Sequence, residues 1–239
     1  MNYFFTKGIS TAADYDYAKY QLLNQKKKTY LVTTDYDRFL SQNLNRLGIL
    51  TTNTINLFDR IQNVTHIPAK KVQLDDLNIV SDIPPVKVNA DTYGFYHEGY
   101  CFCTVKLFSD TAAVDQINYY DRFANLLEID SYDVRGFKSI TTVYGQNGGV
   151  ATDNMYTPDE KLAYEEFYQT NPQTGKIASS LSLVHGEKGV TFYDTRTALI
   201  AKFYQTLNTT SSDTFYATQS FLNQYNFVAD PSIQFLVAE

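Results

Sequence analysis

The spacing of apolar residues changes twice along this chain of 239 residues, and this change limits the possible folds more than any single motif. In residues 1–60, short apolar runs alternate with segments whose apolar residues recur every three or four positions, the period of an amphipathic helix. Gly48 follows the second such segment, where a glycine commonly ends a helix. This order predicts a parallel sheet with helices on its faces. The predicted strands are residues 3–5, 29–33 and 54–58, and the predicted helices are residues 12–24 and 39–47.

From about Ala69 the pattern becomes one of short segments with alternating apolar residues, separated by turns rich in Gly, Pro and Asn. Such alternation with frequent turns is typical of antiparallel strands. We expect an antiparallel meander, and no internal repeat is apparent in its sequence. The predicted strands are residues 71–74, 86–88, 100–108, 116–120, 126–131, 137–143 and 178–183.

The helical period returns after Asp194, and two further apolar runs, at 214–217 and 233–237, lie on either side of a short helical segment. We expect these runs to be two more strands of the first sheet. The predicted fold is therefore an α/β domain, residues 1–68 and 192–239, interrupted by an antiparallel β-sheet insertion, residues 69–191.

The charge of the chain argues against nucleic acid as a partner. Twenty Lys and Arg against 26 Asp and Glu give a net charge of −6, whereas nucleic-acid binding depends on basic residues that neutralise phosphates. The charge is unevenly distributed, with +4 on residues 1–75 and −10 on residues 76–239. No run of about 18–20 apolar residues could span a membrane, and the N-terminus lacks a signal peptide pattern, so we expect a cytoplasmic protein.

The sequence offers no recognisable metal or cofactor site. Cys101 and Cys103 lack the second ligand pair that zinc requires, and His66, His97 and His185 stand singly. We therefore expect buried or half-buried free thiols, no metal and no cofactor. Twenty tyrosines indicate either sugar-binding aromatic platforms or a compositional bias.

The strongest functional signal is the turn sequence that contains Tyr132, Asp133, Arg135 and Lys138. An arginine held by a neighbouring carboxylate can present its remaining donors to a phosphate, a carboxylate or a sugar hydroxyl. The alternative is a hairpin turn stabilised by its own ion pair. Two acidic pairs, residues 159–160 and 165–166, most simply form a solvated surface.

No glycine-rich nucleotide motif follows the first predicted strand. Helix N-termini bind phosphate through free N–H groups and a positive dipole end. Asp14 and Asp16 occupy this position here, so they would repel a diphosphate and are better suited to capping the helix.

These segments resemble poly(glycerol-phosphate) alpha-glucosyltransferases, retaining family 4 glycosyltransferases in which two Rossmann-like domains face each other, an architecture called GT-B. Residues 119–121, 132–137, 165–168 and 175–176 resemble the β-sheet insertion of that family, which serves acceptor engagement or subunit association. The resemblance covers essentially the whole chain and is most specific at residues 132–137. The N-terminal segments that carry it are residues 3–5, 18–23, 31–33, 47–49 and 56–59.

The chain departs from that family in two ways. Family enzymes are about twice as long, because a second Rossmann-like domain binds the nucleotide-sugar and carries the paired glutamates of the donor site. The glycine of the family's donor loop is replaced by Asp14, which puts a side chain and a negative charge where a diphosphate approaches the backbone. The resemblance thus implies no catalytic residue in this chain and a degenerate donor loop at Asp14 and Asp16.

The resemblance therefore implies the acceptor-side half of a glycosyltransferase, inactive alone. Its expected partner is a full-length glycosyltransferase or a second copy in a dimer or trimer, and its acceptor is a protein or a wall polymer. Tyr132, Asp133, Arg135 and Lys138 are the expected substrate- or partner-binding residues. The alternative is a non-catalytic, chaperone-like assembly subunit of a glycosyltransferase complex.

Overall fold

The computed structural model describes residues 1–77, 79, 83–171, 173–207, 213–225 and 235–238. Contacts divide the chain into two compact units. The first unit combines Met1–Ile61 with Thr195–Glu239, and the second unit is Gln62–Asp194.

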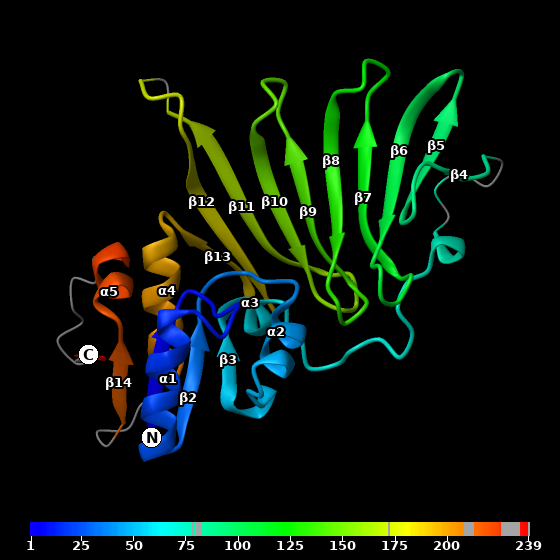
Figure 1. Cartoon of the computed structure of the whole chain (residues 1–239). Helices are drawn as coiled ribbons and strands as arrows, with labels where there is room; N and C mark the ends of the chain where they lie inside the picture. The colour runs from blue at the N-terminus through cyan, green and yellow to red at the C-terminus, as the bar shows by residue number, and fades with distance from the viewer. Residues whose placement is uncertain (78, 80–82, 172, 208–212, 226–234, 239) are drawn as a thin grey trace. The chain divides into compact units, whose positions relative to one another are not determined.

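The first unit is built on a five-stranded parallel sheet with the strand order β15-β14-β1-β2-β3. Figure 1 labels three of these strands, β14, β2 and β3. The chain leaves the central strand β1 toward β2 and β3, and returns to the other side of β1 with β14 and β15. The predicted α/β fold with two late strands is confirmed, and residues 233–234 of the last predicted strand lie outside the described residues. The strands are β1 Asn2–Thr6, β2 Thr29–Thr33, β3 Thr54–Asn56, β14 Thr214–Ala217 and β15 Phe235–Val237, and the helices are α1 Tyr15–Lys26, α2 Leu40–Arg46, α3 Leu57–Ile61, α4 Arg196–Gln205 and α5 Gln219–Tyr225.

The central strand β1 is buried along its whole length, as expected of a parallel strand covered on both faces. Phe4 packs in a cluster with Tyr20 and Leu31. Phe5 points to the opposite face, where its ring contacts the Tyr204 ring edge-on, with the two ring centres 4.6 Å apart. Alternating side chains of one strand therefore supply the cores on both faces of this sheet.

Two local signals decide how elements of this unit end. Gly48 has φ +67° after α2, and the Ile49 amide donates to the Leu44 carbonyl at 2.9 Å, which is the Schellman arrangement predicted for this glycine. The strand predicted for residues 54–58 stops at Asn56 instead. The Asn56 side chain accepts from the Asp59 amide at 2.8 Å and so caps α3, which begins at Leu57.

The second unit is a ten-stranded antiparallel meander in which strands β4 to β13 follow one another in chain order (Figure 1). The predicted β insertion is confirmed, although the prediction omitted β5, β10, β11 and β13. The strands are β4 Val86–Lys87, β5 Thr92–His97, β6 Tyr100–Leu107, β7 Val114–Tyr120, β8 Leu126–Tyr132, β9 Lys138–Tyr144, β10 Val150–Tyr156, β11 Leu162–Thr170, β12 Ile177–Gly186 and β13 Gly189–Tyr193.

The predicted strand at residues 71–74 is wrong. Gln73 makes only an isolated bridge with Ala113, and a short 3-10 helix η2, Leu74–Asp76, follows. The apolar residues of this segment instead pack on one face of the sheet. Val72, Leu74, Leu77, Ile79 and Ile83 cover a cluster formed by Phe95, Cys103, Val105, Val114, Ile117 and Tyr132.

The meander repeats its backbone geometry at a constant interval, a regularity that was not apparent from the sequence. Strands β7, β9 and β11 begin at the evenly spaced positions Val114, Lys138 and Leu162. Turns recur with the same hydrogen bonds at 121–125 and 145–149, and again at 133–137 and 157–161. Backbone conformation recurs at this interval even where the residue type differs: φ is positive at Ala112, Gly136 and Glu160.

No helix among the described residues is both long and apolar enough to cross a membrane.

Candidate functional site

The first unit contains a cavity of about 230 Å³ at the carboxyl ends of β1 and β14. The two strands are neighbours, and the chain turns away from them in opposite directions, toward β2 and toward β15. Ligands of open α/β sheets bind at such a switch point, outside the carboxyl ends of the strands. The cavity is therefore the candidate binding crevice of this unit.

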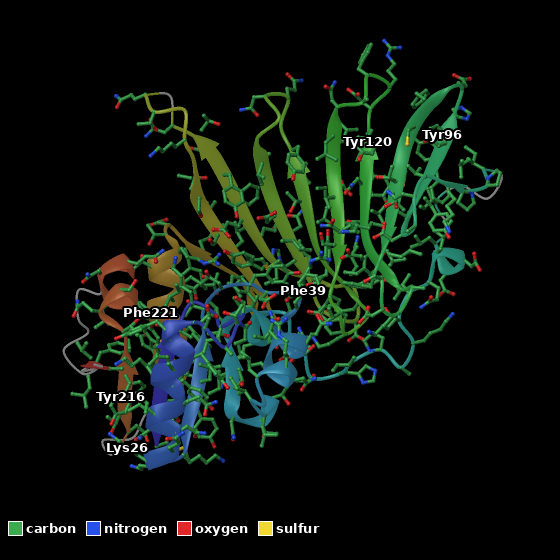
Figure 2. All side chains as sticks on the ribbon, in the orientation of Figure 1. Lys26, Phe39, Tyr96, Tyr120, Tyr216 and Phe221 are labelled. Carbon is green, nitrogen blue, oxygen red and sulfur yellow. The ribbon has the colours of Figure 1, made fainter. Side chains whose placement is uncertain are left out.

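The walls of the crevice come from the end of β1, the start of α1 and the start of α5. Its polar groups are mainly hydroxyls, amides and carboxylates, and Phe221 of α5 adds an aromatic ring (labelled in Figure 2). Among the described lining residues, Lys7 is the one basic side chain. This chemistry suits a hydroxyl-rich group better than a diphosphate, which needs several cationic or N–H donors. The remaining lining residues are Thr6, Gly8, Asp14, Tyr15, Asp16, Thr218, Ser220 and Gln224.

Asp14 lies at the wall of this crevice, but it does not cap α1 with its side chain. Its carboxylate turns back and accepts from the amides of Ser10, at 2.7 Å, and Thr11, at 2.8 Å. Hydrogen bonding from Thr11, assisted by Ser10, holds the pKa of Asp14 below its ordinary value. The predicted capping role is wrong for the Asp14 side chain: Asp14 occupies the N-cap position of α1, but its carboxylate closes the loop before the helix.

Asp16 lines the crevice as well, and its carboxylate accepts a hydrogen bond from the Thr6 hydroxyl at the end of β1. Both acidic groups of the predicted donor loop are thus held at the mouth of the switch point by neutral donors. A diphosphate placed here would meet two carboxylates, which repel it.

The second predicted site is the β8–β9 turn, where Asp133 and Arg135 form a tight ion pair. Asp133 is 1% exposed. Arg135 Nε donates to one carboxylate oxygen at 2.7 Å, and an Nη donates to the other at 2.8 Å. The Arg135 amide also donates to Asp133, at 2.8 Å. Such a bidentate arrangement favours the structural interpretation of the turn, and a role of Arg135 in binding stays a prediction.

Gly136 completes this turn for two physical reasons. Its φ of +101° lies in the region that disfavours side chains, and a Cβ at this position would lie 2.7 Å from Lys71 Cγ. The segment before the sheet therefore packs directly against the turn.

Tyr132 and Lys138 face each other across the same β8–β9 hairpin. Tyr132 is 8% exposed, and burial, followed by the Asp130 charge, raises its pKa. Lys138 Nζ lies 3.6 Å from an Asp130 oxygen and 4.6 Å from the centre of the Tyr156 ring. The four predicted residues do come together at one turn. Burial of Tyr132 and Asp133 indicates that any ligand would reach this turn through Arg135 or Lys138.

The structure corrects one acidic pair and shows one contact that sequence reasoning missed. Glu166 is 4% exposed, so residues 165–166 do not form a simple solvated surface. Glu165 instead lies 2.7 Å from His185 Nε2 on the neighbouring strand. No spacing rule connects two positions so far apart in the sequence. The β11–β12 register pairs Glu165 with Leu183 and so places His185, two residues further along β12, on the same face.

The cysteines are free, and burial raises the pKa of the Cys103 thiol to about 12, so it stays protonated near neutral pH. Within the described ranges, no three His, Cys, Asp or Glu side chains are grouped so that they could hold a metal ion.

No protein-family model matches the chain, and no curated protein matches it in sequence. Solved structures do match it in fold. The Glycosylation Associate Protein (Gap123) complex from Streptococcus agalactiae superimposes with a TM-score of 0.74 at 16% identity, over 99% of this chain and 51% of that chain. The pneumococcal O-GlcNAc transferase GtfA, in complex with UDP and GlcNAc, gives a TM-score of 0.70 at 16% identity, over 99% of this chain and 47% of that chain.

A mutant of Staphylococcus aureus TarM, in complex with fondaparinux, alpha-GlcNAc-glycerol and UDP, gives a TM-score of 0.70 at 10% identity, over 98% of this chain and 49% of that chain. The chain has the fold of one part of a GT-B glycosyltransferase, with a β insertion. It spans about half the length of each of these structures. The GT-B fold expected from the resemblance is thereby confirmed, and the crevice at β1 and β14 is the switch-point crevice of this GT-B domain.

Proposed function

We propose that this chain is the acceptor-side and assembly half of a glycosyltransferase of the poly(glycerol-phosphate) alpha-glucosyltransferase type, acting in the cytoplasm. The observation that carries the proposal is the coverage: nearly the whole chain, parallel sheet and β insertion together, superimposes on about half of a GT-B protein. A second Rossmann-like domain, supplied by a partner or by a longer chain, would provide the sugar donor. The chain by itself transfers no sugar.

The crevice supports the inactive state of the isolated chain. Asp14 and Asp16 stand where a donor diphosphate would approach the start of α1, and among the described lining residues Lys7 alone offers a compensating charge. Hydroxyl and amide groups line the rest, which suits the sugar or the hydroxyl side chain of an acceptor.

The charge of the second unit supports a neutral or basic acceptor. Residues 62–194 carry 10 basic and 18 acidic side chains, a net charge of −8. Like charges oppose association, so a polyanionic wall polymer would be repelled and a Ser/Thr-rich protein or a basic partner surface would not.

A test of the donor side is titration of the chain with UDP-glucose and UDP-GlcNAc by calorimetry. We expect no binding tighter than about 0.1 mM, which corresponds to about −5.5 kcal/mol. Asp14→Gly removes one charge and restores the family's glycine, so this variant should bind UDP more tightly than the original chain does. A dissociation constant in the low micromolar range for the unaltered chain would contradict the proposal.

The assembly role predicts association through an edge of the large sheet. Sheet edges present unpaired backbone groups unless charge or proline protects them. The β4 edge follows Pro84 and Pro85, whereas the β13 edge exposes Val190 (42%) and Phe192 (64%). We expect sedimentation velocity at tens of micromolar to show species heavier than the monomer. Val190→Lys should reduce them, and Val86→Lys on the protected edge should not.

A chaperone-like assembly subunit is the second candidate, favoured by the match to the glycosylation-associated Gap123 complex. The two candidates separate on co-purification with a full-length glycosyltransferase from the native host. An acceptor-side half should raise the partner's transfer rate to acceptor, whereas an assembly subunit should raise only its yield or stability.

A further inference from the structure

The backbone repeat of the second unit places four tyrosines at the same point of alternate strands. Tyr96, Tyr120, Tyr144 and Tyr168 lie near the ends of β5, β7, β9 and β11, and we refer to them as the tyrosine row. Each pairs with the next strand beside a bulge, where the pairing register skips one residue. Figure 2 shows two members, Tyr96 and Tyr120, near the same end of the sheet.

All four tyrosines point to one face of the sheet. The bulges next to the tyrosines lie in the partner strands, and the bulges of β7, β9 and β11 themselves lie at the starts of those strands. The residues that lead up to each tyrosine therefore keep a regular alternation. In each of these strands, the residue two positions before the tyrosine therefore shares its face. Cross-strand pairing links these residues through a single ladder: Gly94, Thr104, Asn118, Ile129, Thr142, Asp153 and Glu166.

Three of the rings are held against the sheet, Tyr96 over its own strand β5 and Tyr120 and Tyr168 over a neighbouring strand. A Cβ on Gly94 would lie 2.8 Å from Tyr96 Cε2, so this ring lies over the glycine backbone. The Tyr120 hydroxyl lies 3.3 Å from Thr104 Oγ1, and the Tyr168 hydroxyl donates to Asp153 at 2.8 Å. A ring tethered at its far end to the neighbouring strand presents a face, and not an edge, to a ligand. Tyr96 is 44% exposed, and the other three are half-buried.

The spacing of the row matches one extended polypeptide conformation. Adjacent strands are about 4.7–4.9 Å apart, so tyrosines on alternate strands are about 9.4–9.8 Å apart. A polyproline II helix rises about 3.1 Å per residue and has about three residues per turn. Every third residue therefore faces the same side at intervals of about 9.3 Å, and the four tyrosines span about nine residues of such a chain.

We propose that the tyrosine row binds an extended polypeptide, rich in Pro, Ser and Thr and without net negative charge, that crosses the strands in the polyproline II conformation. Aromatic surfaces recognise this conformation because a polypeptide that already adopts it loses little conformational entropy on binding. The net charge of −8 on residues 62–194 disfavours an acidic chain. The inference rests on the proposed function, for which such a polypeptide is the acceptor, and it adds the surface and the conformation.

The test is calorimetric titration of the full chain with the acetylated and amidated peptides (Ser-Thr-Pro)2 and (Ser-Thr-Pro)4. The longer peptide places four prolines along the row and the shorter peptide places two, so we expect at least tenfold tighter binding of the longer one. The flexible peptide (Gly-Ser)6 should bind at least tenfold more weakly than (Ser-Thr-Pro)4, because it is not preorganised.

The variants are Tyr144→Ala and the double variant Tyr120→Ala/Tyr144→Ala, with Tyr93→Ala as the matched control. Tyr93 is on β5 like Tyr96, but it pairs with Val105 and so points to the opposite face. We expect the affinity for (Ser-Thr-Pro)4 to fall with each tyrosine removed, by at least tenfold for the double variant. The affinity of the control should change by less than twofold. Thermal melts show whether each variant is folded, and the single variant serves if the double one is not.

Three outcomes would overturn the proposal that the tyrosine row binds an extended polypeptide. They are equal binding of both peptide lengths, binding that the row variants leave unchanged, and row-dependent binding of neutral dextran in place of peptide. If no peptide binds at all, peptide binding by the tyrosine row is also refuted. Co-purification with a glycosyltransferase still decides the proposed function separately.

Discussion

Arg135→Ala is expected to lower the free energy of unfolding by about 3 kcal/mol, because it leaves a buried carboxylate without its bidentate partner. Asp133 is 1% exposed, and the Arg135 side chain is 12% exposed, so water screens the pair little. Urea denaturation of the variant and of the original chain measures the difference, provided that both unfold in one transition with the same slope.

Arg122→Ala is the matched control, since Arg122 lies in the β7–β8 turn and is exposed. Its loss should change stability by less than about 0.5 kcal/mol. Arg135→Lys keeps the charge but loses the planar fork, so an intermediate loss is expected. If Arg135→Ala melts normally but loses partner association, Arg135 is a binding residue and the structural interpretation of the turn is refuted.

Gln62→Leu is expected to destabilise the chain by a similar amount, about 3 kcal/mol. Gln62 is 1% exposed, and its Nε2 donates at 2.8 Å to the carbonyls of both Ser139 and Tyr156. Both carbonyls lie at register shifts between neighbouring strands, where a bulge disrupts the regular ladder. Leucine fills the space but removes both hydrogen bonds, and the loss of a hydrogen bond to a buried carbonyl costs about 1–3 kcal/mol.

Gln169→Leu, at an exposed position of β11, is the control for the general effect of this substitution and should change stability little. Thermal and urea unfolding of both variants provide the measurement. A Gln62→Leu variant as stable as the Gln169→Leu variant would show that water or backbone movement satisfies the two carbonyls, and that Gln62 does not hold the bulges.

Patterns with a local cause were predictable. The helical end at Gly48 depends only on hydrogen bonds within the last turn of α2, and Asp133 and Arg135 meet because they are near neighbours in the sequence. The capping role of Asp14 was wrong although it was also a local prediction. Its carboxylate had two sets of amide donors within reach, those of the helix and those of the loop, and local spacing does not distinguish them.

Side-chain placement across the large sheet was not predictable, and the physical reason is the β-bulge. One extra residue moves all later side chains of a strand to the opposite face. Thus the burial of Glu166 and the pairing of Glu165 with His185 depend on the registers of β10, β11 and β12. The same bulges determine that four tyrosines share a face, which their even spacing in the sequence alone does not show.

The sequence by itself determined the class of each half, because hydrophobic period is a property of neighbouring residues: helical spacing with buried strands for the parallel sheet, and alternation for the meander. Only the tertiary structure decided the backbone repeat of the meander, the common face of the tyrosine row and the crevice at β1 and β14. Glu160 adopts a positive φ in a turn with the same hydrogen bonds as that of Gly136 because the hydrogen-bonded strands on either side require it. The crevice at β1 and β14 likewise exists because the two ends of the chain become neighbours in one sheet, where Phe5 pairs with Ala217.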